Sequence, residues 1–266
     1  MFNHNEIAWA GDDAVEFFGG TINIDHVLAY EPHDDNFDLD EGYHGKQQFI
    51  IGYQTVNCDN SGSHFIESDN DASATAVGPH TNAFIVNATF IGPSVAKNFG
   101  SNANGFYYDG AVFVRRNSRL TLLNSLIIAQ QEPFAVVTTP TTYPLVANSP
   151  SLSDSILIAY NIFQTNSANP VVKSPIEGNP VPLATTTDNG LLGKLGGAAN
   201  GNSAVGSFGD FKLGGALQPL AGSPALSGGQ NLAALGLPFF AGTTQRGAVR
   251  TNDIWTNSPW ISIANN

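Results

Sequence analysis

The chain has 266 residues, is 42% hydrophobic and carries a formal net charge of −12 at pH 7. It is long enough to bury a large core, and its excess of negative charge argues against nucleic acid as a partner, because phosphate binding requires a basic surface. No stretch approaches the roughly 18–20 apolar residues of a membrane span, and the first residues lack the basic and apolar regions of a signal peptide.

Short apolar segments alternate with clusters of Gly, Asn, Asp and Pro along the first 165 residues. They are rich in Val, Ile, Phe, Thr and Tyr, which suit a pleated, half-buried surface. No segment before residue 185 has a convincing helical face. We therefore expect strands at Ala14–Phe18, Thr21–Tyr30, Asn36–Asp40, Gln47–Tyr53, Phe65–Asp69, Ala83–Ile91, Ala111–Arg116, Arg119–Ala129 and Ser155–Phe163.

An internal repeat indicates how these segments stack. Ala14–Tyr30 aligns with Ala111–Ala129 when two residues are inserted at the intervening turn. This alignment predicts equivalent places for Asp25, Asn87 and Asn124. Asn and Asp tolerate the left-handed backbone of tight corners.

A second column runs through the triplets VEF, FDL and IES, which place Glu16, Asp38 and Glu67 in matching positions. Coils of this length fit a parallel β-helix, in which each circuit adds a strand to two or three long sheets. A sandwich of hairpins would instead show two-residue Asn-Gly or Asp-Gly turns between adjacent strands. The predicted fold is therefore all-β, a right-handed parallel β-helix, with a β-sandwich as the alternative.

The composition shifts toward Gly, Ala, Pro and Leu after about Asn166. We expect regular rungs with an acidic face over residues 1–165, and irregular rungs or an end cap, packed on the same domain, over residues 166–266. One short helix is expected near Leu232–Leu235. Trp255 and Trp260 are expected to pack the tail back onto the body.

The acidic residues gather at the start of the chain. Met1–Asp71 holds 15 of the 22 Asp and Glu residues and one of the 10 Lys and Arg residues, Lys46. Alternation along Asn36–Asp40 buries Phe37 and Leu39 and turns Asp38 and Asp40 outward. Glu16 and Glu67 would then lie about 4.8 Å to either side of Asp38, where two unit charges repel by about 1–3.5 kcal/mol.

Protonation, counter-ions in water or a bound hard cation could relieve this repulsion. Oxygen-only ligands suit Ca²⁺ better than zinc, so one hypothesis is a calcium site, and the other is a solvated acidic face without a specific site. The candidate metal ligands are Glu16, Asp34, Asp35, Asp38, Asp40, Glu41, Glu67 and Asp69.

An enzymatic interpretation uses some of the same residues. A β-helix polysaccharide lyase needs a base, for which Lys46 is the local candidate, and a glycoside hydrolase needs two carboxyl groups about 5–9.5 Å apart, such as Asp38 with Asp40 or Glu67. Arg115, Arg116 and Arg119 are expected to bridge acidic neighbours on the same sheet, with contact to an anionic sugar as the alternative.

A resemblance to a known group extends over nearly the whole sequence and is based on the stretches GDDAVEFFGGTINIDHVLAY, DDNFDLDEGYHGKQQFIIG, ESDNDASAT, NAFIVNATFIGPS and RGAVRTNDIW. The chain resembles uncharacterised exported right-handed parallel β-helix proteins of marine and gut bacteria, especially Bacteroidetes, often described as lipoproteins or outer-membrane-associated proteins. The resemblance implies the fold and export, but no known activity. Members of the group usually have further rungs before the GDD motif, so the sequence is compatible with being a piece of a longer chain that exposes a sheet edge.

These observations predict a secreted or surface-exposed bacterial protein, with any signal peptide upstream of residue 1. It would act as a monomer that binds Ca²⁺ and a polysaccharide or cell-surface glycan without catalysis. The alternative is a Ca²⁺-dependent lyase or glycoside hydrolase that acts on an acidic polysaccharide.

Overall fold

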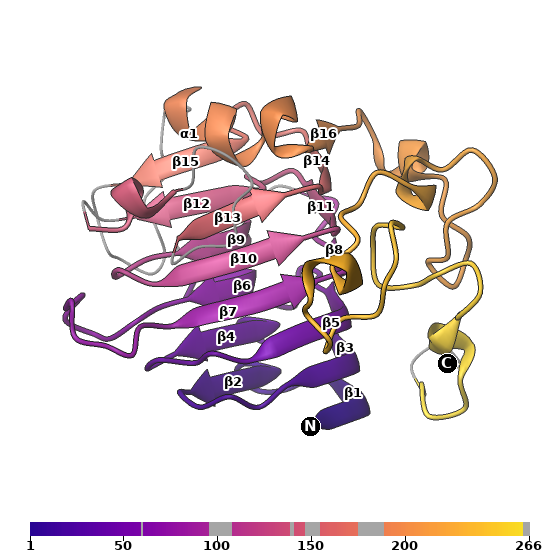
Figure 1. Cartoon of the computed structure of the whole chain (residues 1–266). Helices are drawn as coiled ribbons and strands as arrows, with labels where there is room; N and C mark the ends of the chain where they lie inside the picture. The colour runs from indigo at the N-terminus through magenta and orange to yellow at the C-terminus, as the bar shows by residue number, and fades with distance from the viewer. Residues whose placement is uncertain (60, 96–107, 139–140, 147–154, 175–188, 263–266) are drawn as a thin grey trace.

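The computed structural model describes residues 1–59, 61–95, 108–138, 141–146, 155–174 and 189–262. Within them the chain winds through two sheets in which every strand pairing is parallel. Figure 1 shows the strands stacked from β1 and β2 at the bottom to α1 at the top. The predicted parallel β-helix is confirmed, and the sandwich alternative is wrong because its hairpins would pair antiparallel.

The larger sheet has ten strands. They are β1 (Phe2–Ala8), β3 (Ile24–Tyr30), β5 (Lys46–Tyr53), β7 (Asn82–Val86), β8 (Thr89–Ile91), β10 (Arg119–Leu123), β11 (Leu126–Gln130), β13 (Ile156–Ala159), β14 (Ile162–Thr165) and β16 (Ser203–Ala204). The smaller sheet has six strands. They are β2 (Val15–Phe18), β4 (Phe37–Asp40), β6 (Ser63–Ser68), β9 (Tyr108–Val114), β12 (Ala135–Thr138) and β15 (Val171–Ser174).

Strands that the sequence suggests as single units are divided by one left-handed residue. Asn87 separates β7 from β8 with φ 55°, and Asn124 separates β10 from β11 with φ 55°. Phe49 has the same conformation within β5, which pairs with β7 through its first half and with β8 through its second. The larger sheet therefore bends along a column of corners.

The predicted equivalence of Asp25 with these corners is wrong by one residue. Asp25 pairs with Gln48, and the left-handed residue of that rung is His26, with φ 50°. Histidine is enriched at positive φ in proteins, but it does not signal a corner as strongly as Asn or Asp does. The matched places of Asn87 and Asn124 are confirmed.

The core lies between the two sheets. Phe37, Leu39, Phe65 and Phe90 are fully buried there, with the rings of Phe65 and Phe90 stacked at 5.1 Å. The alternation predicted for β4 is confirmed, because Phe37 and Leu39 point inward while Asp38 and Asp40 retain some exposure. Burial of apolar side chains from successive rungs holds the coils together.

Strands continue past residue 165 as β15 and β16, and the upper end is covered by helices. The covering helices are α1 (Asn189–Leu195) and the 3₁₀ helix η2 (Ala198–Asn200). Four further 3₁₀ helices follow along the chain: η3 (Phe208–Phe211), η4 (Pro224–Leu226), η5 (Ala233–Leu235) and η6 (Trp255–Asn257). Another 3₁₀ helix, η1 (Tyr143–Leu145), lies between β12 and β13. The short helix expected near Leu232–Leu235 is thus a 3₁₀ helix. α1 was not anticipated from the sequence.

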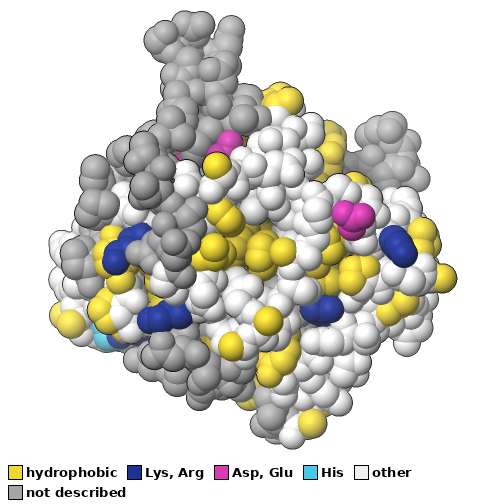
Figure 2. All heavy atoms as spheres, turned by 90° about the horizontal axis from the view of Figure 1, so that it is seen from above, with side chains coloured by type: hydrophobic (Ala, Val, Ile, Leu, Met, Phe, Trp, Pro, Cys, Tyr) yellow, Lys and Arg dark blue, Asp and Glu magenta, His cyan; other side chains and the backbone are white. Residues whose placement is uncertain are grey.

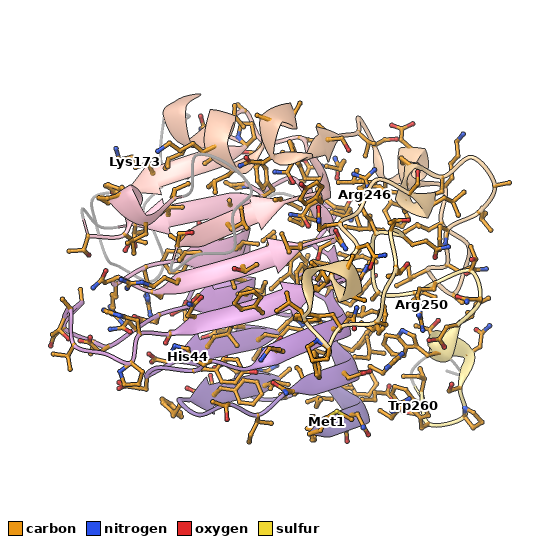
Figure 3. The ribbon with its side chains drawn as sticks, viewed as in Figure 1. Met1, His44, Lys173, Arg246, Arg250 and Trp260 are labelled. Carbon is orange, nitrogen blue, oxygen red and sulfur yellow. The ribbon has the colours of Figure 1, made fainter. Side chains whose placement is uncertain are left out.

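The segment 205–262, which we call the strap, returns along the outer face of the larger sheet toward the first rungs (Figure 1). Amide side chains of the rungs hold it: Asn124 with Gln230, Gln48 with Ala241, and Asn87 with Gln245. Arg250 and Trp260 project from it beside the lower strands (Figure 3). Trp255 is buried and stacks on Trp260 at 5.6 Å, which confirms that these residues pack the tail onto the body.

Candidate carboxylate site

The predicted column of carboxylates is present on the outer face of the smaller sheet. Glu16 on β2 pairs with Asp38 on β4, and Asp38 pairs with Glu67 on β6. The column becomes more buried along the solenoid, because Glu16 is exposed, Asp38 is partly exposed and Glu67 is only 3% exposed. We call these residues and their neighbours the acidic face.

A second column lies three residues earlier in the chain, with Asp13 and Asp35 in the turns before β2 and β4 and His64 in β6. The backbone N–H of Asp35 donates to Asp13 at 2.8 Å, and the backbone N–H of His64 donates to Asp35 at 2.5 Å. The His64 ring lies 3.1 Å from Asp35 and 3.6 Å from Glu67. Both columns therefore meet in one cluster.

Carboxylate oxygens converge into groups whose ligand atoms all lie within 4.8 Å of one another. One group, which we call the outer triad, consists of Asp13, Glu16 and Asp38. The others are Asp12 with Asp13 and Asp34, and the buried set Asp35, His64 and Glu67. Among the described residues, the outer triad forms no ion pair, and the Oδ1 atom of Asp38 is buried without a hydrogen-bond partner.

Arginine neutralises the far end of the face. Arg115 pairs with Glu67 and, at 2.9 Å, with Asp69, and Arg116 reaches Asp69 at 2.5 Å. The expected bridging role of these two arginines is confirmed. Arg119 donates to the backbone carbonyl of Asn117.

Burial dominates the electrostatics of the face, since it favours the neutral form of a carboxyl group. Burial, opposed by the hydrogen bond from the Asp35 backbone and assisted by the charges of Asp34 and Glu16, raises the pKa of Asp13 to about 7. It raises the pKa of Glu67 to about 8, although Arg115 acts in the opposite direction. Burial, followed by the charge of Glu67, raises the pKa of Asp38 well above its usual range.

Other predicted ligands lie at the margins. Burial and neighbouring Asp69 raise the pKa of Asp40 to about 6. Asp34 accepts from the Ser61 hydroxyl at 3.0 Å, and burial raises its pKa. Glu41 is exposed in the turn after β4 and lines a separate hollow of about 220 Å³ with Asn70 and Asp71.

Lys46 lies elsewhere. It begins β5 in the larger sheet, whereas the carboxylates lie on the smaller sheet. The turn between Asp40 and Lys46 carries the chain from one sheet to the other, so adjacency in sequence does not bring the amine to the acidic face. The predicted role of Lys46 as a base therefore loses its geometric basis.

The sequence reasoning missed Asp13 and His64 as members of the site. Asp13 could have been found by extending the Val15–Phe37 register two residues back, which aligns it with Asp35. The same step from Phe37–Ile66 aligns Asp35 with His64. The acidic face belongs to the lower rungs: Figure 2, which views the opposite end, shows few Asp and Glu side chains.

The acidic face can therefore hold protons or a cation on a rigid parallel sheet.

No described helix is long and apolar enough to cross a membrane. Comparison with curated proteins and with solved structures gives no significant match. Residues 1–200 match the family described as "Pectate-lyase like beta helix domain", a fold associated with polysaccharide binding and cleavage. Since this match covers most of the chain, including both carboxylate columns, the chain belongs to the pectate-lyase-like β-helix family.

Proposed function

We propose that the protein is a non-catalytic, calcium-dependent glycan-binding β-helix whose ion site is the outer triad. The observation that carries this proposal is the convergence of carboxylate oxygens from Asp13, Glu16 and Asp38 within 4.8 Å, without an ion pair among the described residues. A hard cation would remove the mutual repulsion of the three groups.

The donor set fits calcium. Ca²⁺ accepts about six to eight oxygen ligands in flexible geometry, and the triad supplies carboxylates from two adjacent strands and the turn before β2. The remaining coordination positions would be available to water and to glycan hydroxyl groups. Exposure of Glu16 supports access from solvent.

Glu67 and Asp69 support this site without binding the ion. Glu67 and Asp69 are already paired with Arg115, so they have less need of a second cation. Their burial also keeps them from a polysaccharide chain. We therefore assign cation binding to the outer triad and a structural role to Glu67 and Asp69.

Glycoside hydrolysis is the second candidate, and the raised pKa values of Asp38 and Asp40 favour it. A carboxyl group that stays protonated near neutral pH can act as a general acid. These two side chains lie two residues apart on the same face of β4, about 7 Å apart by strand geometry, which falls within the range of inverting hydrolases.

Calorimetric titration with CaCl₂ and thermal unfolding test the ion site. We expect Ca²⁺ to raise Tm relative to EDTA, and Asp38→Asn to weaken calcium binding at least tenfold. The matched control is Asp210→Asn, which removes the same charge from the exposed η3 helix and should leave binding unchanged. Equal Tm in EDTA and CaCl₂ would disprove the calcium site.

Affinity electrophoresis in gels that contain pectin, alginate or a neutral glucan tests glycan binding. Retardation in CaCl₂ that disappears in EDTA would support the proposal, whereas unaltered migration in every gel would contradict it. Release of reducing ends from the same polysaccharides, abolished by Asp40→Asn, would favour the hydrolase instead.

The resemblance to exported bacterial proteins supports placement outside the cell, either secreted or on the outer surface. Protease treatment of intact producing cells tests this proposal. We expect loss of the protein from cells while a cytoplasmic marker is retained, and retention of both would contradict it.

A further inference from the structure

A cavity of about 350 Å³ lies between the larger sheet and the strap, away from the acidic face. Its floor comes from β3, β5 and β8, with Leu28, Ile51 and Ile91, and its roof includes Leu217 and Ile261 from the strap. These aliphatic side chains are members of the small apolar clusters that join strap and sheet.

The strap also contacts the neighbouring part of the larger sheet directly. The hydroxyl of Thr89 accepts from the Ala248 backbone N–H at 2.9 Å, and Gln48 accepts from the Ala241 backbone N–H at 2.8 Å. The cavity opens to solvent at its rim, where Gly215 and Asn257 are exposed, while the side chains of Leu28, Ile51 and Ile91 on its floor are buried. A ligand that covers this apolar floor would remove apolar surface from water, which is favourable.

Aromatic rings form one wall. Tyr30 and Tyr53 come from successive rungs, and their rings stack with centroids 5.0 Å apart and planes inclined by 7°. Among the described residues that line the cavity, none carries a charge. The polar side chains among them are those of Tyr30, Tyr53, Thr256 and Asn257, and the Thr256 hydroxyl donates to the Ala216 backbone carbonyl at 2.7 Å.

We propose that this cavity is a binding site for a small uncharged aromatic compound, a single substituted ring that carries a hydroxyl group. The volume lies at the lower end of the range of about 300–1,000 Å³ for ligand pockets. An apolar cavity of about 150 Å³ accommodates benzene, so this one has room for a ring with substituents.

The wall chemistry selects the ligand class. A charged ligand would lose its hydration without gaining a counter-charge. A sugar ring would bury several hydroxyl groups against Leu28 and Ile51, each without a partner. An aromatic ring can pack edge-to-face against the stacked tyrosines, while its hydroxyl reaches the Thr256 and Asn257 end.

Titration of the full chain with methyl ferulate, followed by saturation-transfer NMR and calorimetry, tests this site. The buffer contains EDTA, so the result does not depend on calcium or on the proposed glycan function. We expect methyl ferulate to bind, the ferulate anion to bind at least tenfold more weakly, and methyl glucoside not to bind. Equal binding of methyl ferulate and methyl glucoside, or no binding of methyl ferulate, would overturn the proposal.

Gly215→Leu locates the site. Gly215 lies at the exposed rim of the cavity, and a Cβ there would meet no atom within 4 Å, so a leucine can be accommodated without a clash and would narrow the opening. We expect at least tenfold weaker binding of methyl ferulate. The matched control is Gly193→Leu on α1, where a Cβ also meets open space, and it should bind as the unaltered protein does.

Intermolecular NOEs between the ligand ring and the Tyr30 and Tyr53 rings in the unaltered protein provide a second measurement, which does not depend on the folding of a variant. Their presence supports the assigned cavity. Binding without these NOEs, or undiminished binding by a folded Gly215→Leu variant, would place the ligand elsewhere and refute the assignment.

Discussion

The outward column on the smaller sheet has two halves with opposite chemistry. On the first three rungs it consists of Glu16, Asp38 and Glu67, and on the next three it continues as Phe113, Val136 and Val172. The latter three side chains form a buried apolar cluster. The backbone register is the same throughout, so the coil provides equivalent positions and the side chains alone decide which part can bind a cation.

Phe113 and Arg115 lie at the boundary between the halves. The Phe113 ring stacks against His64 at 4.5 Å, and the Arg115 guanidinium lies 5.2 Å from the centre of the same ring. Arg115 also pairs with Glu67 and Asp69. The boundary thus combines apolar packing with charge compensation, which allows a charged face to adjoin an apolar one.

The largest expected effect comes from Val136→Asp, which places a carboxylate in the apolar half of the column. Val136 is 1% exposed, so the new carboxylate would lose hydration without a partner. We expect a loss of about 5 kcal/mol or more in the free energy of unfolding, from lost packing together with an unpaired buried charge. Urea denaturation at pH 8 measures it, and Val136→Ala is the control for packing alone. Similar losses for the two variants would show that this position tolerates charge.

Removal of the boundary cation should have the next largest effect. Arg115→Ala leaves Glu67 and Asp69 buried without their shared partner, and we expect the free energy of unfolding to fall by about 3–5 kcal/mol at pH 9.5, above the pKa of Glu67. The deficit should shrink at pH 5, where protonation removes the uncompensated charge. Chemical denaturation at the two pH values measures both, and a pH-independent loss would indicate that Arg115 acts only through packing.

Asp38→Asn should change stability in the opposite direction. Without calcium, and at pH 9 or above where the carboxyl groups of the outer triad ionise, the amide removes one of the repelling charges, so we expect the free energy of unfolding in EDTA to rise by about 1–3 kcal/mol. Saturating calcium should reverse the advantage, because the unaltered protein alone keeps all three carboxylate ligands. Thermal unfolding in the two buffers measures this crossover, and a variant that is less stable in both would contradict the predicted repulsion.

A further expected effect is a pH dependence confined to the acidic half. Folding raises the pKa of Asp13 to about 7 and that of Glu67 to about 8, against about 4 in an unfolded chain. The folded protein therefore retains protons that the unfolded chain releases, so this contribution to stability is complete below about pH 4 and is lost as the pH rises through about 7 and 8.

In EDTA, Tm should fall by on the order of 10 °C between pH 5.5 and pH 8.5. Calcium should raise Tm more at pH 8.5 than at pH 5.5, because metal binding requires deprotonated ligands. Differential scanning calorimetry across this range provides the test. A Tm that rises with pH in EDTA would show that the carboxyl groups are not protonated on folding.

Much of the acidic half could be predicted from sequence, because in β4 one carboxylate stands between two apolar residues that must point inward. That pattern sets the facing of Asp38 and its equivalents Glu16 and Glu67. The corresponding prediction for the larger sheet, a corner at Asp25, was wrong because the left-handed residue is His26. A left-handed backbone at histidine has no reliable signature in the sequence. β1 was missed because its sequence, FNHNEIA, is mostly polar.

The partners of the carboxylates were harder to predict. Arg115 is 48 residues from Glu67 in the chain, and only the pairing of β6 with β9 brings them together. Lys46 shows the reverse case, because a turn sends a near neighbour in sequence to the other sheet. The direction in which side chains point along one strand could therefore be predicted from the sequence. The contacts between rungs could not, because they depend on the lengths of the loops.

The strap has a consequence for how this protein can change in evolution. Its contacts reach from Asn124 to Glu6, which accepts from Ser262 at 2.6 Å. Duplication or deletion of one coil between these points would displace the lower half of the solenoid by about 4.8 Å along its axis and would put the two registers out of step. The number of coils is thus coupled to the length of a separate segment, and lineages can alter one only by altering the other.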